Sequence, residues 1–233
     1  MFFLFPYRVE TLFPRMPWAN YLLIIVNVSM FTVTIGQDYW PSGIERMVLD
    51  GWTVVGFFGS LFLHLDFWHL FGNMLYLWVF GNAVCTKIGN FRYLLIYFFF
   101  GAAASVTHLL CDGGPAVGAS GAINGLVGFY LVMYPRNDIY FFWLFFIRAG
   151  TFQISGYWMI GLWLVSDLVG AFLGGGQIAY WAHLGGFFSG FLVGFAMIYF
   201  KFIEFSPADI KTLVEVTTGR EPYFGYEVEQ ARK

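Results

Sequence analysis

The sequence predicts an all-α membrane protein, a bundle of six transmembrane helices with a partly membrane-embedded first outer loop. Only 11% of the 233 residues are charged, whereas soluble domains carry about a quarter. Several apolar runs approach the roughly 20 residues that a helix needs to cross a bilayer core. Aromatic residues make up 23% of the chain, as expected for spans with aromatic belts at both membrane interfaces. These observations indicate one polytopic membrane domain.

Six apolar segments fit transmembrane spans. We expect them at residues 20–35, 67–83, 91–110, 120–134, 156–172 and 178–200, within a membrane domain of residues 20–203. Residues 1–19 are interpreted as a cytoplasmic or interfacial N-terminal segment. They do not resemble a signal peptide, because no basic region precedes the apolar run and two prolines interrupt it. Residues 204–233 are polar and are expected to form a cytoplasmic tail.

The distribution of basic residues predicts the orientation. If the spans alternate, seven basic residues fall on one side: Arg8, Arg15, Lys87, Arg92, Arg136, Arg148 and Lys201. The other side carries four acids and one base: Asp38, Glu45, Asp50, Asp112 and Arg46. By the positive-inside rule, both termini are cytoplasmic. The net charge of −2 makes a nucleic acid an unexpected partner.

Two segments between spans are too apolar for solvated loops. Residues 37–63 are expected to lie in the outer interface as short amphipathic or re-entrant pieces. Residues 139–152 are expected to do the same on the cytoplasmic side, since Arg148 and Gly150 keep this run too short to span. Cys85 and Cys111 fall at opposite membrane faces, so no disulfide is expected between them.

The fourth span, which opens with "GASGAING", is short for a membrane. Its residues rise only about 22 Å, less than the roughly 30 Å of the hydrocarbon core. Its outer end therefore begins below the membrane surface, and the preceding loop "CDGGPAV" dips into the gap. Irregular backbone at that depth is tolerated where protein buries it or water reaches it. The sequence thus predicts a recess, open to the outside, with Ser120 at its floor.

Small residues form stripes on two spans. They are Gly121, Gly125 and Gly128 on the fourth span, and Ala182, Gly186, Gly190 and Gly194 on the sixth. Such stripes let helix backbones approach closely in lipid. Packing them together brings Ser120 to His183 at a similar depth, which places a hydroxyl nucleophile beside an imidazole base.

The stretch "HLDFWHLFGN" at the outer end of the second span supplies hydrogen-bond donors. His69 and Asn73 are four residues apart and share a helix face. Together with the backbone N–H of Ser120 at a helix N-terminus, they describe an oxyanion hole. His64 is turned about 140° away from His69, so its role is open between the site and structural support.

Each of these features also has a simpler explanation. Small residues and serines are common packing elements of membrane helices, and Asn73 can join helices by hydrogen bonds. His108, near the outer end of the third span, is assigned a structural role. A zinc site built from His64, His69 and His183 has enough ligands, but it leaves the serine and Asn73 unexplained. A transporter predicts repeat symmetry between the halves, and the chain shows none.

Taken together, the motifs resemble those of the rhomboid family of intramembrane serine proteases. The resemblance covers about residues 20–203 and is specific because three motifs occur in the family's order. They are His64-x4-His69-x3-Asn73, Gly118-Ala119-Ser120-Gly121, and Ala182-His183-x2-Gly186-x3-Gly190.

The resemblance implies a serine endopeptidase that cuts transmembrane segments of other proteins near their outer ends. It implies a Ser120–His183 dyad with no acidic third member, and an oxyanion hole of His69, Asn73 and the Ser120 N–H. Supporting positions would be His64, Gly118, Gly121, Asn124, Gly186 and Gly190. No cofactor or metal is expected, and the setting would be the lipid bilayer of a bacterial inner membrane. The alternative is a catalytically silent relative that only binds transmembrane helices, but Ser120 and His183 are both present.

The sequence departs from the family pattern in two places. Asn124 stands where some members have a tyrosine that stacks on the catalytic histidine, so His183 must be steadied by a hydrogen bond or by a neighbour such as Trp181. Val55 and Gly56 stand where many members have a Trp-Arg pair, which leaves the anchoring of the first outer loop open.

Two further features complete the expectations for the site. Asp167, in "LVSDLVG", is the one acid that could orient His183, although such groups more often have a structural role. The glycine-rich segment 170–180 is expected to be a mobile lid.

Overall fold

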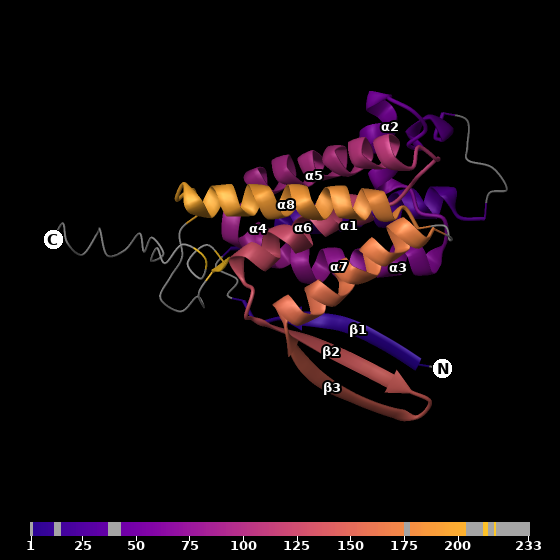
Figure 1. The fold of residues 1–233 in the computed structure, drawn as a ribbon. Helices are drawn as coiled ribbons and strands as arrows, with labels where there is room; N and C mark the ends of the chain where they lie inside the picture. Colours follow the sequence, from indigo (N-terminus) through magenta and orange to yellow (C-terminus); the bar gives the residue numbers. More distant parts are fainter. Residues whose placement is uncertain are drawn as a thin grey trace.

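The computed structural model describes residues 2–11, 15–36, 43–174, 178–203, 212–213 and 217. Its core is a bundle of apolar helices (Figure 1). Five of the expected spans are single helices: α1 (Trp18–Thr34), α5 (Asn90–Cys111), α6 (Ser120–Met133), α7 (Gly156–Leu173) and α8 (Tyr180–Tyr199). The remaining span is composite, with α3 (Phe67–Tyr76) and α4 (Asn82–Ile88) joined by a π-helical turn, Leu77–Gly81. The expected six-helix bundle is confirmed.

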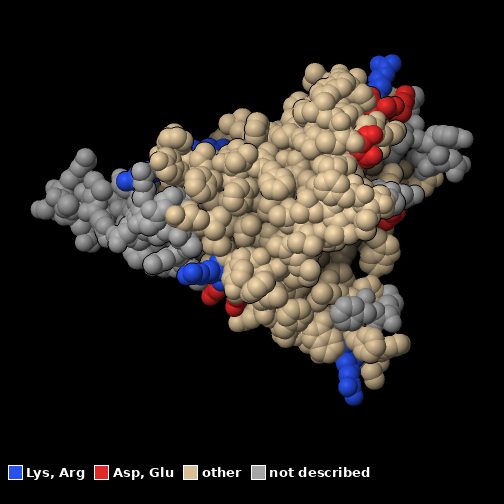
Figure 2. Space-filling view, in the orientation of Figure 1, with Lys and Arg blue, Asp and Glu red and all other residues tan. Residues whose placement is uncertain are grey.

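The helices fit a membrane to different degrees. By length and composition, α5, α7 and α8 can each cross a bilayer. The helical segments Val54–Phe62 and Phe67–Ile88, which meet at a bend of 91°, form a fourth candidate if they are taken as one span. Helices α1 and α6 are apolar but shorter, at 17 and 14 residues. Figure 2 shows a broad uncharged band over the bundle, with charged side chains near its margins. The protein is an integral, multi-pass membrane protein.

Helix α6 is the central element, because α8 packs against it with almost no side chain between the backbones and α5 packs against it through side chains. A Cβ added to Gly186 would overlap the carbonyl group of Gly121, and one on Gly190 would overlap Gly125. On the other side, a Cβ on Gly125 would overlap the Phe100 ring of α5. The two stripes of small residues therefore face each other as the sequence predicts, and α5 covers another side of α6.

A buried polar network ties α1 to the composite span. The Asn20 amide donates to the Leu77 carbonyl at 2.9 Å and to Asn82 Oδ1 at 2.8 Å. The Tyr93 hydroxyl of α5 donates to Asn20 Oδ1 at 2.5 Å. Leu77 is the first residue of the π-helical turn, so the Asn20 amide joins α1 to the irregular part of this span.

The first outer loop is made of short helical pieces, as expected for the part that the structure describes. They are the 3₁₀ turns Glu45–Met47 and Ser60–Phe62 and the helix α2 (Val54–Gly59); residues 37–42 lie outside the described residues. Leu49 and Ala116 exchange two backbone hydrogen bonds of 3.0 Å, and the Gly118 N–H donates to the Ser60 carbonyl at 2.8 Å. These bonds anchor the loop to the segment before α6 without a Trp-Arg pair.

The structure also contains a sheet, which the sequence did not predict. Strands β1 (Phe2–Val9), β2 (Asp138–Phe145) and β3 (Arg148–Ser155) pair antiparallel in the order β1-β2-β3. The expectation of a re-entrant piece at residues 139–152 is therefore wrong. Residues 139–147 are uniformly apolar and show no alternation, so their period cannot be recognised. Their aromatic and β-branched side chains favour a strand.

The sheet lies along one side of the bundle and diverges from it below α7 (Figure 1). Aromatic contacts attach it: Phe5 meets Phe71 of α3 with ring centroids 5.5 Å apart, and Phe141 meets Trp163 of α7 at 6.4 Å. Arg148 begins β3 at the hairpin turn, about 25 Å of strand from the root at Asp138. Arg148 therefore lies far from the end of the sheet at Asp138, whereas the predicted orientation counted it with the other six basic residues on one side.

Two expectations fall wholly or partly outside the described residues. Of the expected lid at 170–180, residues 175–177 are not described, while its first residues end α7 and Tyr180 begins α8. The polar tail is described only at residues 212–213 and 217. Cys85 and Cys111 are both free thiols.

The packing of α6 on α8 predicts that Gly186→Val destabilises the bundle, by at least the roughly 1–3 kcal/mol of ordinary overpacking. The new Cβ would overlap the Gly121 carbonyl, and backbone cannot move aside as a flexible side chain does. Thermal unfolding in detergent measures the effect. Gly161→Val is the matched control, because a Cβ there meets no atom within 4 Å. Equal unfolding temperatures for the two variants would contradict the packing.

Candidate active site

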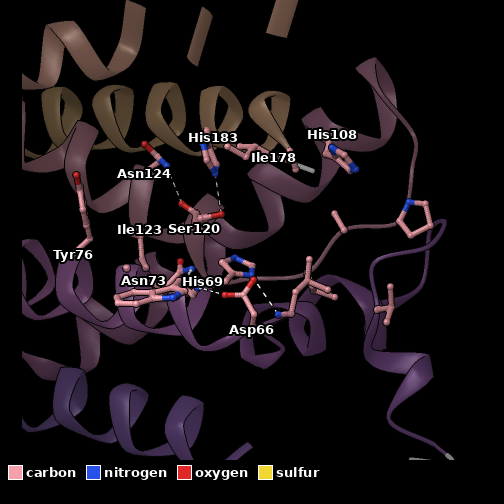
Figure 3. A pocket seen from close by; sticks show the side chains of 18 of the residues that line it. Asp66, His69, Asn73, Tyr76, His108, Ser120, Ile123, Asn124, Ile178 and His183 are labelled. Carbon is pink, nitrogen blue, oxygen red and sulfur yellow. Dashed lines mark hydrogen bonds between the residues drawn. The ribbon is translucent and has the colours of Figure 1, made fainter. Parts of the chain in front are cut away.

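A pocket lined by both apolar and polar side chains opens at the end of the bundle where α6 and α8 begin (Figure 3). Its cavity measures about 710 Å³, within the range of small-molecule and peptide sites. The walls come from α3, the loop before α6, the first turns of α6 and the start of α8. The sequence-predicted residues on the wall are His69, Asn73, His108, Ser120, Asn124 and His183.

Ser120 and His183 face each other across this pocket. The Ser120 Oγ lies 2.9 Å from Nε2 of His183, within hydrogen-bond distance. Ser120 is the first residue of α6, and His183 lies in the first turn of α8. The close approach of the two helices through their glycines sets this distance. The structure thus brings together the two residues that the sequence paired.

Asp167 of α7 contacts the opposite side of the same imidazole. Its Oδ1 lies 3.2 Å from Nδ1 of His183. The sequence favoured a structural role for Asp167, and the signal that pointed to it was the presence of a carboxylate within an otherwise apolar helix. The Tyr180 ring stands edge-on to the His183 imidazole, with 6.3 Å between the ring centroids. Trp181 instead packs against Phe172, with 5.4 Å between the ring centroids. Of the two supports expected for His183, the hydrogen bond is present and comes from Asp167, whereas the neighbouring ring is Tyr180 instead of Trp181.

His69 presents one ring nitrogen to the floor of the pocket. Its Nδ1 accepts a 3.3 Å hydrogen bond from the Leu65 backbone N–H, so a neutral ring carries its proton on Nε2. A Cβ built on Gly118 would lie 2.7 Å from that Nε2 and 3.8 Å from the Ser120 Oγ. Gly118 has φ +122°, a conformation that side chains rarely adopt. Glycine here lets the backbone pass between the histidine and the serine.

The two asparagines bond to the backbone of their own helices. The Asn73 Nδ2 donates to the His69 carbonyl at 2.8 Å, and the Asn124 Nδ2 donates to the Ser120 carbonyl at 3.0 Å. An amide nitrogen has two protons, so Asn73 retains a second donor on the pocket wall. Figure 3 shows Asn73 beside His69 below Ser120, and Asn124 beside His183 above it.

Two further histidines support the surroundings. His64 is buried in the turn before α3, and its ring packs edge-on against His69 at 5.0 Å. Burial, together with the nearby His69, lowers the pKa of His64 to about 3, so this ring is neutral. The His108 Nε2 bonds the Gly114 carbonyl at 2.7 Å and so holds the loop before α6. Among the described residues, no group of three or more His, Cys, Asp or Glu is placed to hold a metal.

The fold and the pocket define a multi-pass membrane protein whose helices enclose a serine–histidine pair. The family model of the Rhomboid domain matches residues 51–200, which is more than half of the chain. The chain belongs to the rhomboid family.

Individual relatives agree with this assignment. Rhomboid protein 1, mitochondrial, of Saccharomyces cerevisiae is 32% identical over 185 residues, 75% of this chain and 51% of that protein. Rhomboid protease GluP of Bacillus subtilis is 30% identical over 133 residues, 52% of this chain and 25% of the relative. Rhomboid protease GlpG of Klebsiella pneumoniae is 25% identical over 187 residues, 76% of this chain and 61% of the relative. The chain thus spans about half the length of the yeast relative.

The crowding at Gly118 predicts that Gly118→Ala disturbs the pocket. The methyl group would overlap the His69 ring and strain a backbone at φ +122°. A displacement of about 1 Å costs on the order of a hundredfold in rate, so we expect labelling of Ser120 by a fluorophosphonate to slow about that much. Gly114→Ala in the same loop is the control, since its Cβ meets no atom within 4 Å. If both variants label at the wild-type rate, His69 does not border the serine.

Proposed function

We propose that the protein is an intramembrane serine endopeptidase that cleaves transmembrane segments of membrane proteins near their outer ends. The observation that carries the proposal is the 2.9 Å contact between Ser120 Oγ and His183 Nε2, inside a pocket at one end of an apolar bundle. Membership of the rhomboid family supports it, since two of the relatives are named as proteases.

The reaction is acyl transfer in two halves. The Ser120 Oγ attacks the carbonyl carbon of the peptide bond while Nε2 of His183 accepts the hydroxyl proton. The resulting imidazolium gives this proton to the leaving amine, which departs and leaves an ester on Ser120. Water enters the pocket, loses a proton to His183 and attacks the ester carbonyl. His183 then returns this proton to the Ser120 Oγ as the new carboxyl group departs. None of these steps requires a metal or a cofactor.

The negative charge of the tetrahedral intermediate is held by donors from two helices. We assign this role to the Nε2–H of His69, the second amide proton of Asn73 and the backbone N–H of Ser120. The last of these is a first-turn N–H of α6, without a partner within its own helix. His64, packed on His69, and Gly118, which gives it room, support this arrangement. Gly121, Gly186 and Gly190 support it by setting the α6–α8 distance.

The location of the pocket favours substrates that reside in the membrane. The pocket lies at one end of a bundle whose sides are apolar, so a substrate helix arriving through lipid must unwind only near its end to enter. Basic residues gather at the opposite end: Lys87 and Arg92 flank the start of α5, and Lys201 follows α8. This asymmetry supports our proposal of a cytoplasmic C-terminus in a bacterial inner membrane. We further propose residues 20–203 as the catalytic domain, flanked by residues 1–19 and 204–233.

The competing proposal is a silent family member that binds transmembrane helices without cutting them. Such a protein needs the pocket but has no use for a serine hydroxyl at hydrogen-bond distance from an imidazole. The 2.9 Å contact therefore favours the enzyme.

Ser120→Ala is expected to abolish cleavage of a model transmembrane substrate, with a rate loss of at least about a thousandfold. His183→Ala should lose as much, and the double variant should be no worse than either, because the pair acts as a unit. Purified protein in detergent or liposomes, with the cleavage products separated by size, gives the measurement. Unfolding temperatures should stay near the wild-type value. Cleavage by Ser120→Ala near the wild-type rate would refute the proposed mechanism.

Asn73→Ala tests the oxyanion hole. Loss of one such donor typically costs about 10²–10³ in kcat, and we expect that loss here with KM little changed. Asn27→Ala is the control, because this buried asparagine of α1 also donates to its own helix, at 2.8 Å to the Leu23 carbonyl, but does not line the pocket. An equal loss in both variants would mean that Asn73 acts only in folding.

A further inference from the structure

The inference concerns Asp167, the only charged residue of α7. An ionisable group in a membrane helix is energetically costly, so it is kept where it is paired or functional. Helix α7 buries only Gly156 and Ile160 among its residues, and most of its surface is therefore left to lipid. The Asp167 side chain is only 18% exposed. It turns away from the lipid toward α8.

The partner of Asp167 is the imidazole that faces Ser120. The Oδ1 of Asp167 lies 3.2 Å from Nδ1 of His183, while Nε2 of the same ring lies 2.9 Å from the Ser120 Oγ. The three side chains come from α7, α8 and α6 and form one continuous line of hydrogen bonds. Asp167 does not line the pocket, so it reaches a substrate only through His183.

The chemistry of imidazole gives this line a direction. A neutral ring has one protonated and one unprotonated nitrogen, and only the unprotonated one accepts a proton. For His183 to take the Ser120 proton at Nε2, its own proton must sit on Nδ1. A carboxylate only accepts hydrogen bonds, so Asp167 selects this tautomer. Its negative charge also stabilises the imidazolium that forms when the serine proton is transferred.

We propose that Asp167 is a positioning residue of the catalytic centre, which holds His183 in its reactive tautomer and orientation and makes the site a Ser120–His183–Asp167 triad. The inference rests on the proposed function. It departs from what the family resemblance implies, namely a dyad with no acidic member.

The other groups around His183 do not replace Asp167 in this role. The Tyr180 ring stands edge-on at 6.3 Å and restricts the imidazole without bonding to Nδ1. Asn124, where some relatives have a stacking tyrosine, donates its amide to the Ser120 carbonyl. His69 lies across the pocket and bonds Leu65 through its Nδ1. With no stacking ring at position 124, the carboxylate supplies the restraint on the imidazole.

Asp167→Asn separates this role from a purely structural one. The amide keeps the shape and the hydrogen-bonding capacity of the side chain but removes its charge and can present a donor to Nδ1. We expect kcat to fall at least about tenfold. The upper limit is the roughly 10⁴-fold loss that the same Asp→Asn change causes in a soluble serine protease with a Ser-His-Asp triad. KM should change by less than about threefold. If Asp167 only tethers α7 to α8, Asp167→Ala lowers the unfolding temperature and Asp167→Asn restores both stability and rate.

Ser166→Ala is the matched control, because the neighbouring serine is exposed and its loss should leave kcat and stability unchanged. A second measurement reports on Asp167 independently of turnover. The chain has four histidines, so ¹⁵N-histidine spectra in detergent are simple to assign by comparison with His183→Gln. We expect the His183 proton on Nδ1 in the wild-type protein, and a shift of this tautomer toward Nε2–H in Asp167→Asn.

The two proposals fail in different ways. If the wild-type protein cleaves no faster than Ser120→Ala, the proposed function is wrong, and the tautomer of His183 still decides whether Asp167 orients it. If the enzyme is active and Asp167→Asn keeps the wild-type kcat, the inference is overturned. It is also overturned if His183 carries its proton on Nε2 in the wild-type protein.

Discussion

The structure depends on the backbone contact between α6 and α8. Gly186 and Gly190 lie against the backbone of Gly121 and Gly125, where a single added Cβ would overlap carbonyl groups. In lipid no hydrophobic driving force pushes helices together, so close packing of small residues must hold them. The same contact places the first turns of both helices at one depth. The serine and the histidine therefore meet because glycines, which take no part in chemistry, remove the space between their helices.

A second constraint is that polar groups within a membrane bundle must find partners inside the protein. The loops around the pocket satisfy it locally, since Leu49 bonds Ala116, Ser60 bonds Gly118, and His108 bonds Gly114. Far from the pocket, the Asn20 network does the same for the irregular turn of the second span. These bonds allow a short α6 to begin below a layer of ordered loops. The resulting recess is polar at one end of a molecule that is otherwise apolar.

The sheet beside the bundle is held by aromatic contacts and by long-range strand pairing. It is attached to α3 and α7 through aromatic rings, and its first and second strands come from segments more than a hundred residues apart. It adds a wall next to the helices that carry His69 and Asp167. The sheet therefore extends the surface around the site without contributing a residue to the pocket wall.

The sequence by itself determined the membrane class, the six helices and the pairing of Ser120 with His183. These follow from local patterns: apolar length, glycines at steps of three and four, and polar residues at matching helix ends. It could not decide the fate of residues 139–152, because the uniformly apolar run 139–147 has no visible period, and the pairing of β1 with β2 is not local. It left Asp167 open for a related reason. A carboxylate in an apolar helix indicates a partner, but only the rotation of α7 against α8 brings Oδ1 to 3.2 Å from His183 Nδ1. Tertiary packing fixes that rotation, and the periodicity of a nearly all-apolar helix does not encode it.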